Sequence, residues 1–327
     1  MAEQIRLFED ATEVVAPVST GNDPQTIEWS YSRRDLFERC LFWYYCQYYG
    51  ATAGKAKIDP LKPQLRFLKS LSNCHLRAGD LLHLVIRTYF RRLNSGERWS
   101  ETEILRWAED LFKRDRNHSL NYLRSGRPGA DNGHEVILAE FYYGWPEAED
   151  FWQGSAIKLR KALTNFLTLP KFESFRAGAK HPQALIEKTV RLREDHFRLR
   201  GQIDLAFPEN DRVAVVDWKI GGAGGGEDSL QLLSYALVAM KEYNCSPEKI
   251  DLFRVHLSDG EVTHWIVRAE EIQRAKARII QDVQRMMTMD HYGREGARSA
   301  FTPCHQARVC RMCPYHDFCR KEVDVYA

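Results

Sequence analysis

The sequence predicts an α/β fold from the order of its apolar patterns, its turn signals and the spacing of its charged residues. The strand patterns cover residues 196–207, 213–220, 249–258 and 261–269. A turn signal at 208–212 joins the first two, and Asp259-Gly260 joins the last two. A helical pattern separates the two pairs, and an amphipathic helix is expected over 269–290. The resulting order, helix, strand hairpin, helix, two strands, helix, is that of an α/β core.

Alternation gives the direction of the side chains in the first hairpin. Apolar residues take one face of the first strand, and Arg198, Arg200, Gln202 and Asp204 take the other. The apolar positions are Phe197, Leu199, Ile203, Leu205 and Phe207. On the second strand Asp217 and Lys219 are two residues apart and share a face. If the hairpin is centred between residues 210 and 211, Asp204 lies opposite Asp217, with Cβ atoms about 5 Å apart.

Two opposed carboxylates predict a bound cation. Opposed like charges destabilise a sheet unless another charge offsets them. Mg²⁺ and Mn²⁺ prefer oxygen ligands and leave positions free for water and a phosphate oxygen. Lys219 beside the ion is placed to orient or deprotonate an attacking water. Asp204, Asp217 and Lys219 are therefore candidate catalytic residues, and a surface hairpin with solvated charges is the alternative.

The helix after the hairpin adds two candidate residues. Gln231 and Tyr235 are four apart and share one face, from which they could reach DNA or hold Lys219. An ordinary polar pair on an amphipathic helix is the alternative. The glycine-rich stretch 221–226 lacks the Gly-Lys-Ser/Thr ending of a phosphate loop, and we expect it to be a mobile link.

The 327 residues are expected to form one elaborated domain after a flexible arm. Residues 1–28 mix polar residues and prolines with no sustained period, which indicates the arm. The motifs extend from Cys40 to Cys319, so a single unit covers 29–327. Its parts are a helical insertion over 95–183, a catalytic core over 184–290 and a cysteine segment over 300–327.

Helical patterns dominate the first half of this domain. Residues 29–49 are expected to form one helix, and 63–93 two helical pieces broken around His75–Gly79. The insertion is interrupted at 125–129 by a turn or loop with two glycines and a proline. We expect the insertion to cover the core and to form one wall of a DNA channel.

Eight cysteines indicate a second metal site. The chain is too long for a disulfide-stapled miniprotein and no secretory leader precedes it, which favours reduced thiols or metal ligands. Cys310, Cys313 and Cys319 form a C-x2-C-x5-C run that needs a fourth ligand. Cys304 would complete a local zinc or iron–sulfur knuckle, and Cys40 is the other candidate. The remaining thiols, which have no partner spacing and are expected in the core or at the surface, are Cys46, Cys74 and Cys245.

The hairpin motifs resemble those of the PD-(D/E)xK nuclease superfamily, RecB-like branch. The matching residues are Gly201-Gln202-Ile203-Asp204, Asp217-Trp218-Lys219 and the pair Gln231 and Tyr235. Gly79-Asp80-Leu81-Leu82-His83 is similar to the helical motif whose histidine joins the carboxylates at the metal. The resemblance implies a restriction-endonuclease-like core with a central mixed sheet flanked by helices. It also implies four metal ligands: His83, Asp204, Asp217 and the backbone carbonyl of Trp218.

The resemblance extends to the cysteines. The segment from Tyr31-Ser32 to Cys40-Leu41-Phe42-Trp43-Tyr44-Tyr45 is similar to the entry helix of iron–sulfur nucleases. In those relatives an N-terminal cysteine and three C-terminal cysteines hold a 4Fe-4S cluster. The ligands implied here are Cys40, Cys310, Cys313 and Cys319, with structural zinc as the alternative. Such a cluster joins the N- and C-terminal regions and removes loop entropy from the unfolded chain.

Three further residues have expected roles near the hairpin. Similar proteins often carry a glutamate upstream of the first aspartate, and we expect Glu187 to support the metal ligands from outside the set. A formal charge of +2 is too small to indicate nucleic-acid binding by itself. Arg198 and Arg200 share the parity of Asp204, however, and could neutralise a DNA backbone beside the scissile bond.

The sequence thus predicts a metal-dependent DNA nuclease that hydrolyses phosphodiester bonds and leaves 5′ phosphates, with an exonuclease favoured. Similar domains act in DNA repair and recombination, CRISPR adaptation and antiviral defence, and a helicase or other subunits are expected partners. The alternatives are a non-cleaving nucleic-acid-binding or scaffold subunit and a zinc-knuckle adaptor. No apolar stretch is long enough to cross a bilayer, so we expect no membrane partner and a cytoplasmic location.

Overall fold

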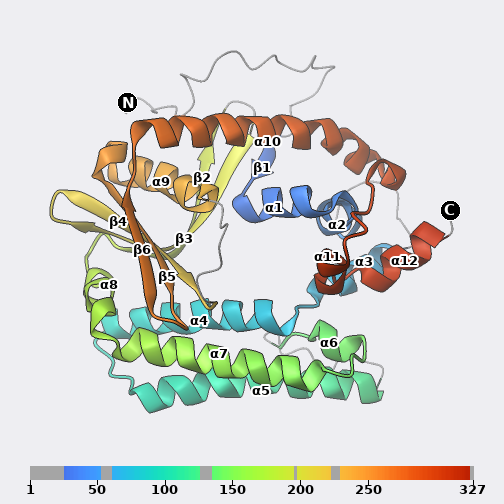
Figure 1. Cartoon of the computed structure of the whole chain (residues 1–327), viewed down its shortest axis with the longest axis horizontal. Helices are drawn as coiled ribbons and strands as arrows, with labels where there is room; N and C mark the ends of the chain where they lie inside the picture. The colour runs from blue at the N-terminus through green and yellow to red at the C-terminus, as the bar shows by residue number, and fades with distance from the viewer. Residues whose placement is uncertain (1–25, 53–60, 126–134, 195–196, 222–228, 325–327) are drawn as a thin grey trace.

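A six-stranded mixed sheet is at the centre of the protein (Figure 1). The computed structural model describes residues 26–52, 61–125, 135–194, 197–221 and 229–324. The strands are β1 (Ile27–Trp29), β2 (Leu185–Arg193), β3 (Phe197–Glu209), β4 (Arg212–Lys219), β5 (Ile250–His256) and β6 (Glu261–Ile266). Their order is β1-β3-β4-β5-β6, with β2 also paired to β3. The predicted α/β class and its central mixed sheet are confirmed.

Parallel and antiparallel ladders alternate across this sheet. β1 with β3 and β4 with β5 are parallel, whereas β2 with β3, β3 with β4 and β5 with β6 are antiparallel. The predicted second hairpin is present, because Gly260 has a φ of +71° and its N–H donates to the His256 carbonyl at 2.8 Å. A short 3-10 turn, η3 (Pro247–Lys249), precedes β5.

Helices cover both faces of the sheet and divide the interior into two cores. On one face α9 (Leu230–Tyr243) and α10 (Ala269–Glu295) pack with the N-terminal helices in what we call the α9-side core (Figure 1). On the other face lies the α4-side core, named after α4 (Cys74–Asn94). The predicted helix over 269–290 is confirmed and continues to Glu295.

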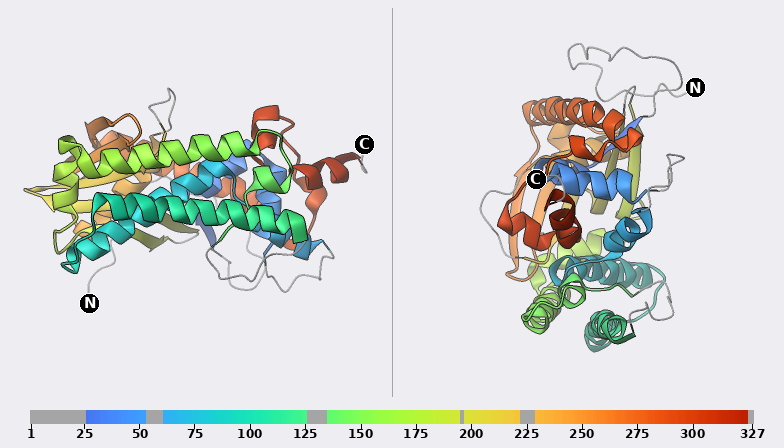
Figure 2. Two further views of the ribbon diagram at one scale, coloured as in Figure 1. Left: turned by 90° about the horizontal axis from the view of Figure 1, so that it is seen from below. Right: turned by 90° about the vertical axis from the view of Figure 1, so that its right-hand side faces the viewer.

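The insertion predicted over 95–183 is helical. Its elements are α5 (Glu101–Ser125), α6 (Ala139–Tyr142), α7 (Ala148–Thr168), η2 (Pro170–Phe172) and α8 (Glu173–Gly178). Of these, α5, α7 and α8 pack in the α4-side core, whereas Ile137 and Ala139 reach the α9-side core. Seen from below, α5 and α7 run side by side beneath α4 (Figure 2). Most of the predicted loop at 125–129 lies outside the described residues.

The N-terminal region departs from the prediction in two ways. Residues 1–25 of the expected arm lie outside the described residues, but Ile27 and Glu28 pair with β3, so the predicted boundary at 28 is wrong. The single helix expected over 29–49 is divided into α1 (Tyr31–Arg39), α2 (Leu41–Tyr45) and the π-helix η1 (Cys46–Gly50). The break falls at Cys40, whose extended backbone (φ −163°, ψ 113°) ends α1.

The break predicted around His75–Gly79 is also misplaced. The two helices are α3 (Lys62–Ser70) and α4, and the interruption covers 71–73. Asn73 explains the position, because its side chain accepts a hydrogen bond from Leu76 N at 2.8 Å and so caps α4. Ser72 bridges to Leu138 in the insertion.

The C-terminal segment packs against the N-terminal helices. It contains η4 (Arg298–Ala300), α11 (Ala307–Met312) and α12 (His316–Asp324). Phe42 N donates to the Thr302 carbonyl at 3.2 Å, and the Phe42 and Phe318 rings stack at 6.2 Å. The N-terminal helices and the C-terminal segment are therefore held together by packing; the cluster predicted to join them stays a prediction.

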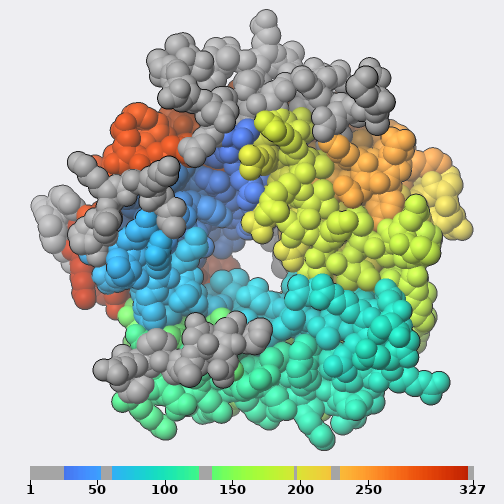
Figure 3. Space-filling model, turned by 180° about the vertical axis from the view of Figure 1, so that it is seen from behind, coloured from blue at the N-terminus to red at the C-terminus, as the bar shows by residue number. Residues whose placement is uncertain are grey.

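The space-filling view shows an opening through the molecule (Figure 3). Within the described residues it is bordered by β2 and β3, by α4 and by the N-terminal helices. No described helix has the length and apolar character needed to span a membrane.

Candidate active site

The predicted hairpin register is present in the structure. The β3–β4 ladder pairs Glu209 with Arg212 and continues to Leu205 opposite Val216. One step further along this register places Asp204 opposite Asp217. The Trp218 N–H donates to Asp204 Oδ2 at 2.8 Å, and both carboxylates are buried, with 5% and 1% of each residue exposed. Two acidic side chains are thus removed from water next to each other.

The face of β3 changes at Asp204, which simple alternation did not predict. Leu199 and Ile203 pack in the α9-side core, as expected for one face. Leu205 and Phe207 have the same parity but lie in the α4-side core. The prediction that all the odd-numbered apolar residues share a face is therefore wrong beyond residue 203.

The neighbouring strand β2 changes face at the same level. Val190 packs in the α9-side core, and Ile186 packs against the α4-side core. Between them Glu187 has a φ of +46°, in the left-handed region that non-glycine residues seldom adopt. The pair Glu187 and Asp204 is missing from a ladder whose register is the same on both sides. Strained backbone of this kind concentrates at functional sites.

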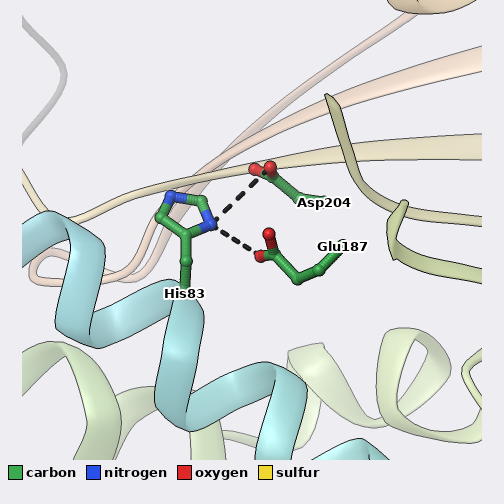
Figure 4. A group of neighbouring side chains, drawn as sticks. All are labelled: His83, Glu187 and Asp204. Atoms are coloured by element: carbon green, nitrogen blue, oxygen red, sulfur yellow. Dashed lines mark hydrogen bonds and ion pairs between the residues drawn. The ribbon is translucent and has the colours of Figure 1, made fainter. Parts of the chain in front are cut away.

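The change of face brings three ligand groups together (Figure 4). His83 Nδ1 lies 2.7 Å from Glu187 Oε1 and 3.6 Å from Asp204 Oδ1. The three ligand atoms all lie within 4.8 Å of one another, the spacing that a metal ion requires. Glu187, which we expected to support the set from outside, stands in it beside His83 and Asp204. Gln202 Nε2 donates to the other Glu187 oxygen at 2.9 Å and orients it.

The amphipathic pattern of α4 directs His83 toward the strands. Leu81, Leu82, Val85 and Ile86 are fully buried in the α4-side core and fix the rotation of the helix. His83 keeps 30% of its side chain exposed, so an ion at this position would be accessible from solvent.

Burial and the crowded carboxylates shift the pKa values of this group. Burial disfavours the charge on His83, but the carboxylates of Asp204, Glu187 and Asp217 outweigh it and raise its pKa to about 9. Burial raises the pKa of Asp204 to about 7; the His83 charge opposes this, and Asp217 and Glu187 add to it. A divalent cation would favour the ionised carboxylates and the neutral imidazole, so the donor set suits Mg²⁺ or Mn²⁺.

Asp217 belongs to a second polar chain next to this group. Lys219 Nζ donates to Asp217 Oδ1 at 3.1 Å and to Gln231 Oε1 at 2.9 Å. Gln231 Nε2 in turn donates to the Tyr235 hydroxyl at 2.9 Å. Burial raises the pKa of Tyr235 well above its usual value, so this phenol stays neutral. The structure thereby connects Gln231 and Tyr235 to Lys219, and Asp217 to the same lysine.

Close packing of α9 on β3 positions Gln231 and Tyr235. A Cβ atom added at Gly201 would lie 3.2 Å from Val238 Cγ2 and 3.7 Å from Tyr235 Cδ1. The first distance is tighter than an ordinary contact, so a side chain at residue 201 would push Val238 away by a few tenths of an ångström, and the glycine of the Gly-Gln-Ile-Asp motif permits the close approach of the helix.

One further residue at this site had no signal in the sequence. Arg254 lies opposite Asp217 in the parallel β4–β5 ladder, with its Nε 3.9 Å from Asp217 Oδ2. The sequence does not give the β4–β5 pairing that puts Arg254 beside Asp217, so this residue could not be predicted. The Trp218 indole points away from the site into the α4-side core, edge-on to Phe166 and Phe175.

The predicted DNA-binding arginines are exposed on the part of β3 that precedes Asp204. Arg198 lies opposite Arg193, and Arg200 opposite Arg191, in the β2–β3 ladder. Arg200 and Arg191 also approach Glu28 of β1.

Five cysteines line a single cavity of about 200 Å³ between the N-terminal helices and the C-terminal segment. They are Cys40, Cys304, Cys310, Cys313 and Cys319. Burial raises the pKa of the Cys40 and Cys310 thiols, so a bound metal ion would be needed to hold them as thiolates. As predicted, Cys46 and Cys74 are buried core thiols, and Cys245 is half-buried.

Cys304 lies between two of the cavity thiols, because its sulfur is within hydrogen-bonding reach of both Cys40 and Cys310. Tetrahedral zinc with four thiolates needs sulfur atoms about 3.8 Å apart. Throughout the described ranges, only the atoms of His83, Glu187 and Asp204 form a set of three such ligands within 4.8 Å.

A mixed sheet with paired carboxylates and a lysine on its central hairpin, covered by helices on both faces, defines a restriction-endonuclease-like nuclease fold. The model of the PD-(D/E)XK nuclease superfamily matches residues 28–320, and the chain belongs to this superfamily. This membership implies a nuclease that hydrolyses phosphodiester bonds, with DNA as its substrate, and such nucleases typically use Mg²⁺ or Mn²⁺.

No curated protein matches the chain significantly. A solved structure entitled "Crystal structure of SSO0001" aligns with 71% of this chain and 92% of its own at 12% identity. The TM-score of 0.25 is too low for that alignment to support an argument.

Proposed function

We propose that the protein is a metal-dependent deoxyribonuclease that acts as an exonuclease. The observation that carries the proposal is the convergence of His83, Glu187 and Asp204 next to the bonded pair Asp217 and Lys219. The first three would hold Mg²⁺ or Mn²⁺, with Asp217 and the Trp218 carbonyl as the further ligands expected from the sequence. When bound, such an ion makes a water molecule more acidic and offsets charge on the phosphate.

Lys219 is the side chain placed to act on the substrate. An ammonium group has three N–H donors, and the bonds to Asp217 and Gln231 account for two. Among the described residues none besides these two accepts from this ammonium group, so the third N–H can donate to the attacking water or to a phosphate oxygen. Gln231, held by Tyr235, keeps the ammonium from rotating away.

The test is cleavage of end-labelled linear DNA by the purified protein with Mg²⁺, Mn²⁺ or EDTA. We expect products only with a divalent ion, and none with Lys219→Ala. Lys249→Ala is the matched control, because Lys249 pairs with Asp211 at the opposite end of the same sheet. Full cleavage in EDTA, or by Lys219→Ala, would overturn the mechanism.

The opening through the molecule supports an exonuclease. The elements that border it include β2, β3 and α4, which carry Glu187, Asp204 and His83 (Figure 3). A strand that reached these residues by threading through this opening would need a free end. We therefore expect linear single-stranded DNA to be degraded and a circular single strand of the same length to resist. Equal cleavage of both would instead establish an endonuclease.

We further propose that the cysteine cavity holds a 4Fe-4S cluster through Cys40, Cys310, Cys313 and Cys319. The cavity that these four cysteines share between the N-terminal helices and the C-terminal segment supports it. Cys40→Ser should lose iron and acid-labile sulfide from anaerobically purified protein, whereas Cys304→Ser should keep both. Stoichiometric zinc without iron would reject the cluster, and the reverse pattern of variants would make Cys304 the ligand.

The proposed setting is the one expected from the sequence. DNA repair or recombination, CRISPR adaptation and antiviral defence all require such an activity, and a helicase or other subunit would deliver the strand. Neither Walker-type phosphate loop nor second ATPase motif is encoded here.

A further inference from the structure

Two arginines of β2 lie directly opposite two arginines of β3, an arrangement that destabilises a sheet. The ladder places Arg191 directly opposite Arg200 and Arg193 directly opposite Arg198. All four side chains are exposed. Directly opposed like charges destabilise a sheet, so this surface costs stability unless an anion covers it. The arrangement indicates an anion-binding function.

One carboxylate of the protein already occupies this surface in part. Glu28 Oε2 lies 3.3 Å from Arg191 Nε, and Glu28 Oε1 lies 3.5 Å from Arg200 Nη1. A carboxylate that bridges two guanidinium groups uses the same donors that a phosphate would use. For Arg193 and Arg198, no acidic partner is found within the described part of the chain.

An aromatic side chain lies next to the bridge. The Arg33 guanidinium stacks 4.5 Å from the centre of the Tyr48 ring and is fixed by the Tyr44 hydroxyl and the Glu28 carbonyl. The charges of Arg200 and Glu28 both act on the half-buried Tyr48 hydroxyl, whose pKa burial raises to about 12. Tyr48 lies in the π-helix η1, and π-helical turns occur frequently at functional sites.

We propose that Arg191, Arg200, Arg33 and Tyr48 form a binding subsite for single-stranded DNA, in which a backbone phosphate displaces the Glu28 carboxylate. The two arginines bind the phosphate, and the Arg33–Tyr48 pair offers a stacking surface to the adjacent base. Single strands suit this site because their unpaired bases can reach an aromatic surface beside a basic groove. Glu28 then acts as an internal competitor of the substrate. The proposal rests on the proposed nuclease function for its choice of ligand.

Because Glu28 competes with the phosphate, removal of its charge should increase the affinity for single-stranded DNA. Glu28→Gln keeps the size of the side chain but removes its charge, so the phosphate no longer has to displace an anion. We expect affinity for a fluorescein-labelled single-stranded oligonucleotide to rise about three- to tenfold in anisotropy titrations. The titrations use Asp217→Asn protein in EDTA, so that no cleavage occurs and binding is measured apart from catalysis.

The chain offers a closely matched control. Glu38 on α1 also bridges two arginines, Arg278 and Arg285 of α10, and its exposed fraction of 31% equals that of Glu28. Glu38→Gln changes the net charge identically on another surface and should leave affinity unchanged. Equal tightening by both variants would reduce the effect to net charge and overturn the subsite, as would no tightening by Glu28→Gln.

Two further variants separate the phosphate contact from the stacking. Arg200→Ala should weaken binding and lower the slope of log affinity against log salt by about 0.7, the value for one phosphate contact on a single strand. Tyr48→Ala should weaken binding with little change in slope, and Tyr48→Phe should retain it. An unchanged slope for Arg200→Ala, with melting temperatures unaltered, would contradict the phosphate contact.

Discussion

The carboxylate site and the cysteine cavity differ in how their parts are brought together. The carboxylates lie on hydrogen-bonded strands whose register fixes their separation, and α4 adds His83 from a helix buried on its apolar face. The cysteine cavity joins Cys40 to residues at the far end of the chain, where Phe301, Tyr315 and Phe318 pack in the same core as the N-terminal helices. The fold positions the first site without a metal, whereas a metal group at the second would add a cross-link between the two ends of the chain. Substitutions at the carboxylate site should therefore reduce DNA cleavage, whereas substitutions at the cysteine cavity should reduce the stability of the fold.

The largest expected effect is the loss of cleavage at the carboxylate site with the fold intact. Asp204→Asn keeps an oxygen that accepts from the Trp218 N–H but removes a metal ligand. We expect cleavage to fall about a thousandfold or more, with a melting temperature within a few degrees of the parent. Asp211→Asn, at the turn of the same hairpin, is the control. Extensive unfolding of Asp204→Asn would show that the carboxylate site is needed for the fold, contrary to the difference proposed between the two sites.

The cysteine cavity should show the opposite behaviour. A metal group that links Cys40 to Cys319 closes a loop of most of the chain, which in a cross-link model is worth about 5 kcal/mol. Cys313→Ser should therefore lower the melting temperature by about 10 °C, while the protein that remains folded still cleaves DNA. Cys245→Ser, which alters a half-buried thiol outside the cavity, should change neither property. A melting temperature that is unchanged in Cys313→Ser would remove the proposed structural role.

Metal binding at the carboxylate site should depend on pH, because the ligands must lose protons before they can bind the ion. In the metal-free protein His83, with a pKa near 9, carries a proton that a metal ligand must lose, and Asp204 keeps part of its proton below about pH 7. Metal affinity should therefore rise with pH between 6 and 9, by about tenfold per unit for one displaced proton. Calorimetry in buffers of different ionisation enthalpy measures the proton release. His83→Gln should flatten the profile, and an affinity independent of pH would contradict the protonated state.

The smallest effect is expected at the polar chain behind Lys219. Tyr235→Phe removes the hydroxyl that holds Gln231 and so loosens the lysine without removing it. We expect kcat to fall about three- to tenfold with KM unchanged. Tyr243→Phe, which removes a hydroxyl of the same helix bonded to Gln183 and Ala206 carbonyls, should leave kcat unaltered. A fall in both variants would indicate a general effect of α9 packing.

The hairpin was predictable because its register depends only on local alternation and a turn. Asp204 and Asp217 could thus be paired from the sequence alone. The change of face at Asp204 could not, because Ile203 and Leu205 are both apolar and give the same pattern whichever core they enter. The place of Glu187 in the ligand set is not predictable for a different reason, because it depends on the β2–β3 pairing and on a left-handed backbone at Glu187 itself.

The structure supports only part of the pattern that predicts the helical motif of His83. A Cβ atom at Gly79 would meet nothing within 4 Å, so packing does not require the leading glycine. The apolar residues around His83 determine its direction instead. Arg254 and Glu28 were not found because both act across ladders between strands far apart in the sequence.

The parallel pairing of β1 with β3 has a consequence for biosynthesis. Ile27 can pair with Phe197 only after about 170 further residues have been synthesised. The hydrogen bond from Phe42 to Thr302 requires a still longer stretch of chain. At about 5–20 residues per second, the first strand and the aromatic helices behind it remain without their partners for on the order of ten seconds or more. The nascent N-terminal segment therefore exposes Phe37, Phe42 and Tyr45, all buried at completion, for that time, and such exposed apolar surface favours aggregation.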